Sequence, residues 1–236
     1  MWPFTRKRYS LLESGLLKGS ADRHCHILPG VDDGIRTMEE ALDALSWYGL
    51  QGVSEVWLTP HIMEDIPNAI GALLERFRQL EEAYCGPVKL HLASENMLDS
   101  LFAERLASRD LLPLGTEGKN LLVETSYFNP PAGFDEMLGM IAEAGYEPVL
   151  AHPERYVYME MADYRALAGA GIKLQLSLPS LCGSYGRAAQ KKAHEILKAG
   201  LYSLCGSDLH RLAAFREAAS AKVLDGETIK ILEKLI

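Results

Sequence analysis

Short apolar runs alternate with longer amphipathic segments along most of the chain. The short runs predict strands at 53–58, 88–93, 120–123, 148–151, 172–176 and 201–205, with a further one before His24. The longer segments predict helices at 37–48, 68–84, 98–108, 133–144, 161–168 and 187–199. Thr37 and Glu40 have the spacing of a helix capping box, and Gly145 ends the helix at 133–144. We therefore expect about seven strands, each followed by a helix.

Regular alternation of strand and helix around one core favours a parallel α/β barrel over an open sheet. Candidate functional residues follow nearly every predicted strand. In an open sheet these residues would be spread along a wide edge, whereas in a closed barrel the carboxyl ends of all strands face one mouth. The sequence therefore predicts a parallel barrel whose site lies at the C-terminal mouth. We expect residues 1–20 to be an N-terminal extension and residues 21–236 to form a single domain.

Histidines and carboxylates recur in short motifs at the ends of the predicted strands. Five of the seven histidines lie in these motifs, and several acidic residues accompany them. His24 and His26 are two positions apart on an extended segment, so both imidazoles point to the same side and can bind one cation. A mixed set of histidines and carboxylates suits Zn, Mn or Fe rather than Ca. The pattern is typical of a multinuclear metallohydrolase.

A single histidine is more often structural than a metal ligand. A structural role does not account for the whole group, because Glu95, Glu124 and Asp208 all adjoin apolar runs. A buried charge is costly unless it is paired or bound to a metal. We therefore interpret the group as a metal site.

The composition is that of an ordinary globular protein, with 236 residues, 48% hydrophobic and 24% charged. The net charge of −8 argues against nonspecific binding to nucleic acid and against attraction to an anionic membrane. The charge of three divalent ions, about +6, would outweigh the negative charge of the four candidate carboxylates, Asp33, Glu95, Glu124 and Asp208. The overall acidity therefore does not exclude a phosphorylated substrate.

The four cysteines contain no CxxC pair and no run approaches the length of a membrane span. The first 20 residues are a poor secretory signal, because Glu13 and Lys18 interrupt their apolar stretch. We therefore expect a cytoplasmic protein without stable membrane insertion.

The longest motif, DRHCHILPGVDDG, runs from Asp22 to Gly34. It is followed by Thr59-Pro60-His61, Val123-Glu124-Thr125, Ala151-His152-Pro153-Glu154-Arg155 and Ser207-Asp208-Leu209-His210. In these motifs the chain resembles the polymerase-and-histidinol-phosphatase (PHP) superfamily, and within it the bacterial capsule-type, manganese-dependent protein-tyrosine phosphatases. Arg211 departs from the pattern, since many relatives have Asn after the final His, and it bears on substrate contacts rather than on ligation.

The resemblance implies a distorted seven-stranded (β/α) barrel with three divalent transition-metal ions, manganese by expectation, with iron or zinc as alternatives. One ion would take His24, His26, Glu95 and Asp208; a second would share Glu95 and add Glu124 and His152; the third would take Asp33, His61 and His210. It also implies a phosphotyrosine protein as substrate, with the tail of a bacterial tyrosine autokinase that controls capsule or exopolysaccharide export as the partner.

The residues themselves suggest roles in phosphate-ester hydrolysis. Arg155 follows His152 by three residues and is the candidate bidentate clamp for the phosphate, the alternative being a salt bridge to Glu154 or to a neighbouring loop. His61 or His210 could protonate the leaving group if it is not fully committed to a metal. We expect a metal-activated water to attack without a covalent enzyme intermediate.

Rival mechanisms and substrates stay open at this point. A cysteine-dependent tyrosine phosphatase needs a Cys-x5-Arg loop, which only Cys205 and Arg211 match, and that loop would put Asp208 in the phosphate cradle. Histidinol phosphate is the nearest alternative substrate. An amidohydrolase-like barrel enzyme and a noncatalytic metal-stabilised barrel also remain open.

Overall fold

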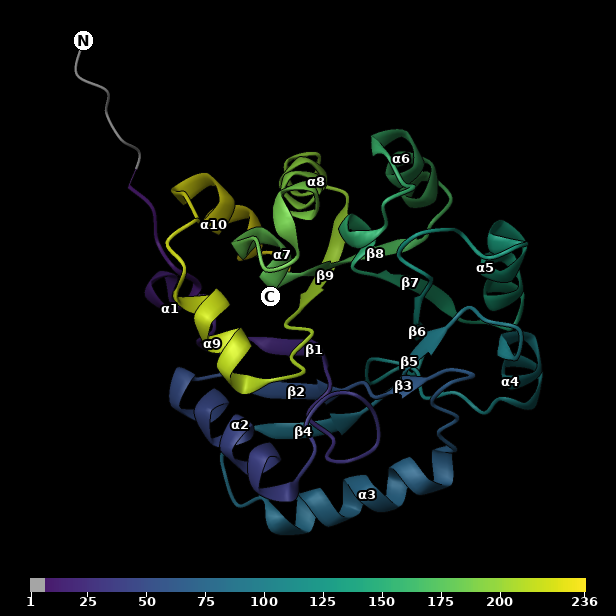
Figure 1. The fold of residues 1–236 in the computed structure, drawn as a ribbon, viewed down its shortest axis with the longest axis horizontal. Helices are drawn as coiled ribbons and strands as arrows, with labels where there is room; N and C mark the ends of the chain where they lie inside the picture. The colour runs from purple at the N-terminus through teal and green to yellow at the C-terminus, as the bar shows by residue number, and fades with distance from the viewer. Residues whose placement is uncertain (1–6) are drawn as a thin grey trace.

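The computed structural model describes residues 7–236, and its strands surround a common centre with the helices on the outside (Figure 1). All paired strands run parallel. The strands are β1 (Ala21–Cys25), β2 (Glu55–Leu58), β3 (His61–Ile62), β4 (Lys89–Leu92), β5 (Glu95–Met97), β6 (Asn120–Glu124), β7 (Glu147–Ala151), β8 (Lys173–Ser177) and β9 (Tyr202–Gly206). They form two sheets, ordered β1-β2-β4 and β3-β5-β6-β7-β8-β9.

Two of the seven predicted strands are each interrupted once, so the structure has nine strand segments within residues 7–236. β2 is separated from β3 at Thr59 and Pro60, and β4 from β5 at Ala93 and Ser94. The two tracks stay side by side across the breaks, because Ala93 N–H donates to Leu58 O at 2.8 Å and Glu95 N–H to Pro60 O at 3.1 Å. Proline has no N–H to donate, which favours an interruption at this point. The predicted seven strands are thus present, with two of them broken.

The first and last strands lie beside one another. Asp208 N–H donates to His24 O at 2.8 Å, and His26 N–H donates to Leu209 O at 2.9 Å. These hydrogen bonds lie at the carboxyl ends of β1 and β9, and they hold the residues that directly follow the two strands next to one another. The predicted α/β fold with parallel strands is confirmed, and its hydrogen-bond ladder is interrupted rather than continuous.

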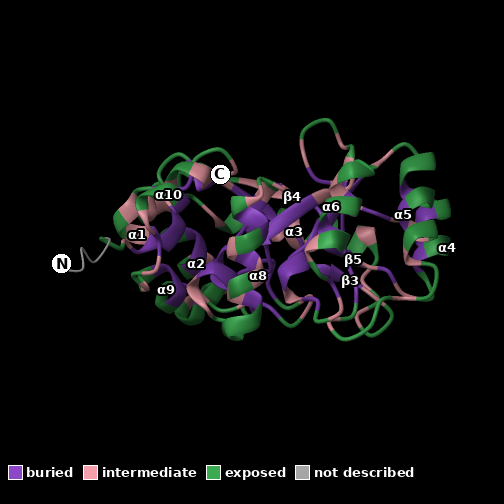
Figure 2. Ribbon diagram, turned by 90° about the horizontal axis from the view of Figure 1, so that it is seen from above, coloured by how far each residue is buried: buried purple, intermediate pink, exposed green. Residues whose placement is uncertain are grey.

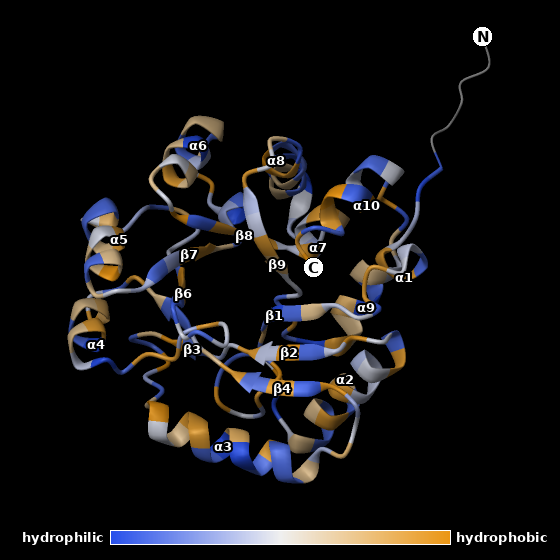
Figure 3. Cartoon of the chain, turned by 180° about the vertical axis from the view of Figure 1, so that it is seen from behind, coloured by the Kyte–Doolittle hydropathy of each residue, from blue (hydrophilic) through white to orange (hydrophobic). Residues whose placement is uncertain are grey.

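The helices cover the outer face of the strands, and Figure 2 shows exposed residues on the helices and buried residues along most of the strands, although β4 is only partly buried. They are α1 (Leu11–Ser14), α2 (Met38–Gln51), α3 (Ile70–Ala83), α4 (Phe102–Ser108), α5 (Phe134–Glu143), the 3₁₀ helix η1 (Pro153–Arg155), α6 (Met161–Gly169), α7 (Leu178–Cys182), α8 (Gly186–Lys198), α9 (Leu212–Ser220) and α10 (Gly226–Leu232). In α3 and α8 hydrophilic and hydrophobic residues lie on the same helix, as expected for elements with one buried face (Figure 3).

The predicted helices agree with the structure to within a few residues. The capping box at Thr37 is confirmed, since its side chain accepts the Glu40 N–H and Glu40 caps the Thr37 N–H in return. The sequence pattern predicted no element at α1, α7, α9 or α10. α7 has only five residues and α9 has no side-chain cap, so neither carries a strong local signal.

The N-terminal extension predicted over 1–20 is described only from residue 7 onwards. There Tyr9 pairs with Leu224 in an antiparallel bridge, and Leu11, Leu16 and Leu17 are buried in the main hydrophobic core. This segment therefore packs against the barrel, while the division at residue 20 stays a prediction. Within residues 7–236, no helix combines the length and the apolar character that crossing a membrane requires.

Candidate metal centre

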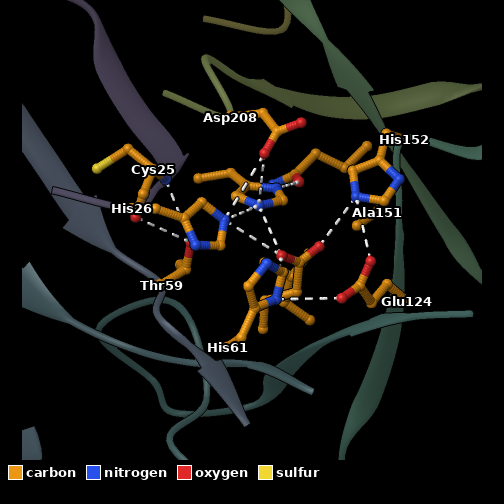
Figure 4. A network of polar contacts seen from close by, with 12 residues as sticks. Cys25, His26, Thr59, His61, Glu124, Ala151, His152 and Asp208 are labelled. Atoms are coloured by element: carbon orange, nitrogen blue, oxygen red, sulfur yellow. Dashed lines mark hydrogen bonds and ion pairs between the residues drawn. The ribbon is translucent and has the colours of Figure 1, made fainter. Parts of the chain in front are cut away.

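All nine predicted ligands come together at one place in the fold. They form four overlapping groups in which one ligand atom from each residue lies within 4.8 Å of the others. The groups are His26, Asp33, His61 and His210; His24, Glu95 and His152; His24, His26 and Asp208; and His61, Glu95 and Glu124. Figure 4 shows His26, His61, His152 and Asp208 pointing towards a shared centre.

The ligands are supplied by the carboxyl ends of the strand positions. His24 lies in β1, His61 begins β3 and Glu95 begins β5. Glu124 ends β6, while His152 and Asp208 follow β7 and β9 by one and two residues. Parallel strands arranged around one centre bring these ends to the same mouth, as expected from the sequence.

His24 and His26 face each other through their Nε2 atoms, which are 3.1 Å apart. The Nδ1 atom of His24 lies 2.6 Å from Gln175 Oε1, and that of His26 lies 2.8 Å from Asp32 Oδ2. Both partners are hydrogen-bond acceptors, so each Nδ1 is placed to donate its proton to them, and each Nε2 is left to take a cation or a second proton at the centre. Two lone pairs at this separation repel unless a cation or a proton lies between them.

Gln175 and Asp32 are therefore orienting residues that sequence reasoning missed. Asp32 also accepts the backbone N–H groups of Gly34 at 2.9 Å and His61 at 3.1 Å, which ties the first motif to the start of β3. Metal-binding histidines usually have such a partner on the second ring nitrogen. A signal for Asp32 was its place beside Asp33, whereas Gln175 lies 151 residues from His24 and had none.

Glu95 is the central carboxylate and is completely buried. Its Oε2 atom lies 3.1 Å from His24 Nε2, 3.2 Å from His26 Nε2 and 3.2 Å from His61 Nδ1. Its Oε1 atom lies 3.0 Å from His152 Nε2. Burial raises the pKa of Glu95, but the surrounding histidines outweigh burial and hold that pKa well below its ordinary value. Glu95 is therefore a carboxylate that faces several groups at once, as a bridging ligand would.

Five buried polar atoms of the ligand set lack a hydrogen-bond partner within residues 7–236. They are His61 Nδ1, Glu95 Oε2, Glu124 Oε1, His152 Nδ1 and Asp208 Oδ1. Native proteins seldom leave buried polar atoms unsatisfied, because each costs about 1–3 kcal/mol. Most of these atoms face the common centre, and imidazole with carboxylate suits Mn, Fe or Zn. The donor set therefore fits bound transition-metal ions.

The grouping of the ligands differs in part from the expected one. The group around Asp33 contains His26 in addition to His61 and His210, and His61 also joins Glu95 and Glu124. His152 is grouped with His24 and Glu95. The assignment of residues to individual ions and the number of ions therefore stay predictions.

Two ligands have a left-handed backbone that is uncommon for residues other than glycine. His152 has φ 34° and Asp208 has φ 50°. Such conformations cost about 1–3 kcal/mol and persist where the surrounding structure imposes them. Here the reversal of the chain directly after β7 and β9 turns both side chains into the mouth of the barrel.

Arg155 reaches the centre from the single turn of η1. Its Nη1 donates to Asp208 Oδ2 at 2.7 Å, and its side chain is only 17% exposed. Within residues 7–236 the alternative salt bridge to Glu154 does not form, and Glu154 instead accepts the Ser177 N–H at 3.0 Å and the Tyr202 hydroxyl at 2.9 Å. A salt bridge to a neighbouring loop does form, since Asp208 lies in the loop after β9.

The two candidate proton donors, His61 and His210, both line the cavity. Burial disfavours the charged form of His61, but Glu95 and Glu124 outweigh burial and raise its pKa to about 10. Burial also lowers the pKa of His210, but its bond to Asp33 prevails and the pKa is raised. Without metal, the His61 imidazole is therefore positioned to hold a proton at neutral pH, and the pKa of His210 is shifted in the same direction.

A cavity of about 450 Å³ opens above the ligands. Polar groups of the centre, including Asp33, His61 and Arg155, form one side of it. The lining also includes Tyr127, Pro179, Ser184, Tyr185, Leu209, Arg211, Ala214 and Phe215. The side chain of Asp33 is 65% exposed, so the ligand group that contains Asp33 lies at the solvent-exposed end of the metal centre.

The Cys205 side chain lies apart from this cavity. Its Sγ atom donates to Leu235 O at 3.6 Å, and burial raises the pKa of the thiol to about 12. A nucleophilic cysteine requires an accessible thiolate. The Cys-x5-Arg spacing to Arg211 therefore does not form a phosphate-binding loop.

Comparison with known proteins agrees with these observations. Residues 20–223 match the family described as capsular polysaccharide synthesis, CpsB/CapC. The tyrosine-protein phosphatase YwqE of Bacillus subtilis is 27% identical over 197 residues, which cover 81% of this chain and 77% of YwqE. The tyrosine-protein phosphatase CpsB of Streptococcus pneumoniae is 27% identical over 204 residues, with 81% and 83% covered.

Similarity to solved structures gives the same result. A structure from the work on YwqE and CpsB, described as unique metal-dependent tyrosine phosphatases, matches with a TM-score of 0.76 and 25% identity, covering 91% of this chain and 86% of the matched chain. The inactive dihydroorotase-like domain of a Chaetomium thermophilum protein matches with a TM-score of 0.58 at 11% identity, covering 92% and 76%, which shows a shared fold alone. With a family match that spans nearly the whole barrel, the chain belongs to the CpsB/CapC family of capsular polysaccharide synthesis proteins.

Proposed function

We propose that this protein is a metal-dependent protein-tyrosine phosphatase that acts in the cytoplasm on a tyrosine autokinase of capsule or exopolysaccharide synthesis. The relatives named above are tyrosine-protein phosphatases. The observation that carries the proposal is the position of Arg155 beside six of the nine ligand residues in the lining of one cavity, with the other three grouped with them in the metal centre. A guanidinium beside a cation site is an arrangement suited to a phosphate ester.

The nine residues would hold up to three ions, for which manganese is our first choice. When bound, such ions polarise phosphoryl oxygens and lower the pKa of a water molecule. The chain's own contribution is to aim the ligand atoms, with Gln175 behind His24 and Asp32 behind His26. The buried carboxylates of Glu95 and Glu124 would balance the positive charge of the ions.

Arg155 binds the phosphoryl group of the substrate in this proposal. Its Nη1 is engaged by Asp208, and within residues 7–236 its Nε and Nη2 have no hydrogen-bond partner. These donors remain for the oxygens of a phosphate at the cavity. Negative charge that builds on those oxygens in the transition state is then stabilised by a group already in place.

The leaving group is a phenolate, whose conjugate acid has a pKa near ~10. Such a group needs less help from a proton donor than an alkoxide does. His210 is 27% exposed and lines the cavity, so it can donate a proton to the departing oxygen if it is not fully committed to a metal. His61 is the second candidate, although its contacts with Glu95 and Glu124 commit it more strongly to the centre.

The proposal is tested with a substrate panel on metal-loaded protein. We expect hydrolysis of phosphotyrosine peptides well above that of phosphoserine peptides and of histidinol phosphate, and loss of activity with a chelator. A preference for histidinol phosphate would favour a small-molecule phosphatase. Activity on hydantoins or dihydroorotate without phosphatase activity would indicate an amidohydrolase-like enzyme, and inactivity on every substrate would indicate a noncatalytic barrel.

A further inference from the structure

The guanidinium of Arg155 lies over two tyrosine rings. Its Cζ atom is 4.3 Å from the ring centroid of Tyr127 and 4.0 Å from that of Tyr185. A cation at this distance from the ring centre is attracted by the negative face of the ring. Arg155 is therefore in contact with two aromatic rings at once.

Three separate segments build this arrangement. Tyr127 lies in the loop after β6, Arg155 ends η1 after β7, and Tyr185 precedes α8. The first two are tied together by Val157 N–H, which donates to Tyr127 O at 2.9 Å. Tyr185 lies between Gly183 and Gly186, whose φ values of 86° and 87° suit glycine and allow a sharp turn there.

Asp208 holds the guanidinium from a third direction by a hydrogen bond. Its Oδ2 atom accepts Arg155 Nη1 at 2.7 Å and the Tyr185 hydroxyl at 3.1 Å. The two ring contacts and the carboxylate together therefore limit the movement of the guanidinium. What remains free is the edge that carries Nε and Nη2, in the cavity that Arg155 lines.

We propose that Tyr127 and Tyr185 are positioning residues whose rings hold Arg155 in place with one donor edge free for the phosphoryl group of the substrate. This inference rests on the proposed phosphatase function and deepens it. A flexible arginine would lose rotamer freedom when it binds phosphate, whereas here the structure has already imposed that loss. The rings act through Arg155 and not on the reacting atoms.

The test is a double-mutant cycle on metal-loaded protein with a phosphotyrosine peptide. Tyr127→Leu and Tyr185→Leu should each lower kcat/KM about 3- to 30-fold with unchanged metal content, as expected for the loss of one cation–π contact. In the Arg155→Ala background, Tyr127→Leu should add less than about a twofold loss, because its effect passes through the arginine. Equal losses in both backgrounds would overturn the proposal.

Conservative variants separate the ring from the hydroxyl. Within residues 7–236 the Tyr127 hydroxyl has no hydrogen-bond partner, so Tyr127→Phe should retain the activity that Tyr127→Leu loses. Tyr185→Phe should retain the stacking and lose only the bond to Asp208. Tyr158→Leu is the matched control, since Tyr158 lies on the loop after η1 and stacks on Tyr156 rather than on Arg155. A loss in Tyr127→Phe as large as in Tyr127→Leu would contradict a role for the ring.

A binding measurement keeps the two proposals apart. The same cycle is measured on the dissociation constant of inorganic phosphate, which does not require turnover. If the wild type hydrolyses no phosphotyrosine peptide, the proposed function fails, and the phosphate cycle still decides whether the rings act through Arg155. If the wild type is active and the cycle is additive in both measurements, only the positioning role fails.

Discussion

Arg155 and Asp208 share one hydrogen bond, from Nη1 to Oδ2 at 2.7 Å, and this bond joins the proposed phosphate clamp to a proposed metal ligand. The second carboxylate oxygen of Asp208, Oδ1, lies 3.5 Å from His24 Nε2 and 3.6 Å from His26 Nε2. One carboxylate thus faces the metal centre with one oxygen and the arginine with the other. Burial raises the pKa of Asp208, but His24, His152, His210 and Arg155 together prevail and lower it to about 2. Asp208 is therefore ionised and able to serve both neighbours.

Arg155→Ala should impair catalysis and leave the metals bound. The arginine is not a ligand, and Asp208 keeps its contacts on the Oδ1 side. We expect kcat/KM to fall roughly 10²–10³-fold, equivalent to ~2–4 kcal/mol of transition-state stabilisation. Arg165→Ala on the exposed face of α6 serves as the control and should retain activity. Near wild-type kcat/KM in Arg155→Ala would mean that the arginine is structural.

His24→Ala and Asp208→Ala should lower metal occupancy as well as rate, because each removes a predicted ligand. Elemental analysis of metal-loaded wild type should give up to three ions per chain. Kinetics and metal content measured together separate these variants from Arg155→Ala. Fewer than one ion per chain in the wild type would rule out the trinuclear centre.

Cys205→Ser should retain most of the phosphatase activity. The thiol lies outside the cavity, and a serine hydroxyl can replace its bond to Leu235 O. Turnover and metal content should both resemble the wild type. A trapped phosphocysteine, or loss of turnover at normal metal content, would show that the thiol takes part in the reaction.

Gly206→Ala should disturb His24. An added Cβ at Gly206 would overlap the Cβ of His24 and press on its backbone, so one of the two strands must shift. We expect a loss of about 1–3 kcal/mol in the free energy of unfolding together with weaker metal binding. Gly139→Ala is the control, because α5 has open space there and a helical alanine stabilises by about 0.5–1 kcal/mol. Normal metal affinity in Gly206→Ala would show that β9 can move away without cost to the site.

Metal affinity should rise with pH between about 6.5 and 9. Burial disfavours the imidazolium of His24, but Glu95 outweighs burial and raises its pKa from 6.5 to about 9 in the metal-free protein. Binding must therefore displace a proton, and calorimetry in buffers of different ionisation enthalpy should detect its release. A pH-independent affinity without proton release would contradict this charge state.

The raised pKa of His24 also makes the stability of the metal-free protein depend on pH. Because the pKa is raised in the folded state, the stabilisation is complete below pH 6.5 and is lost as pH rises through about 9. The melting temperature of metal-free protein should decline over this range. The metal-loaded protein should not follow, since its histidines have already given up their protons.

The sequence by itself determined the repeating strand and helix, the cap at Thr37 and the identity of the residues that gather at the mouth. These features depend on periodicity and on neighbours a few residues apart. A ligand such as Glu95 or Asp208 could be predicted because a carboxylate beside an apolar run is costly to bury unless it is paired or binds a metal. The grouping of these ligands around individual ions could not be predicted, because it depends on how far each strand extends towards the centre.

Only the tertiary structure decided which side chains support the ligands and the arginine. Gln175 meets His24 across 151 residues, and Arg155 meets Asp208 across 53. Neither pair has a local pattern, because the contacts arise when parallel strands from distant parts of the chain are brought around one centre. The same arrangement puts the rings of Tyr127 and Tyr185 against Arg155, although each belongs to a loop with no regular period. Periodicity specifies elements, and the way those elements pack around the barrel specifies the site.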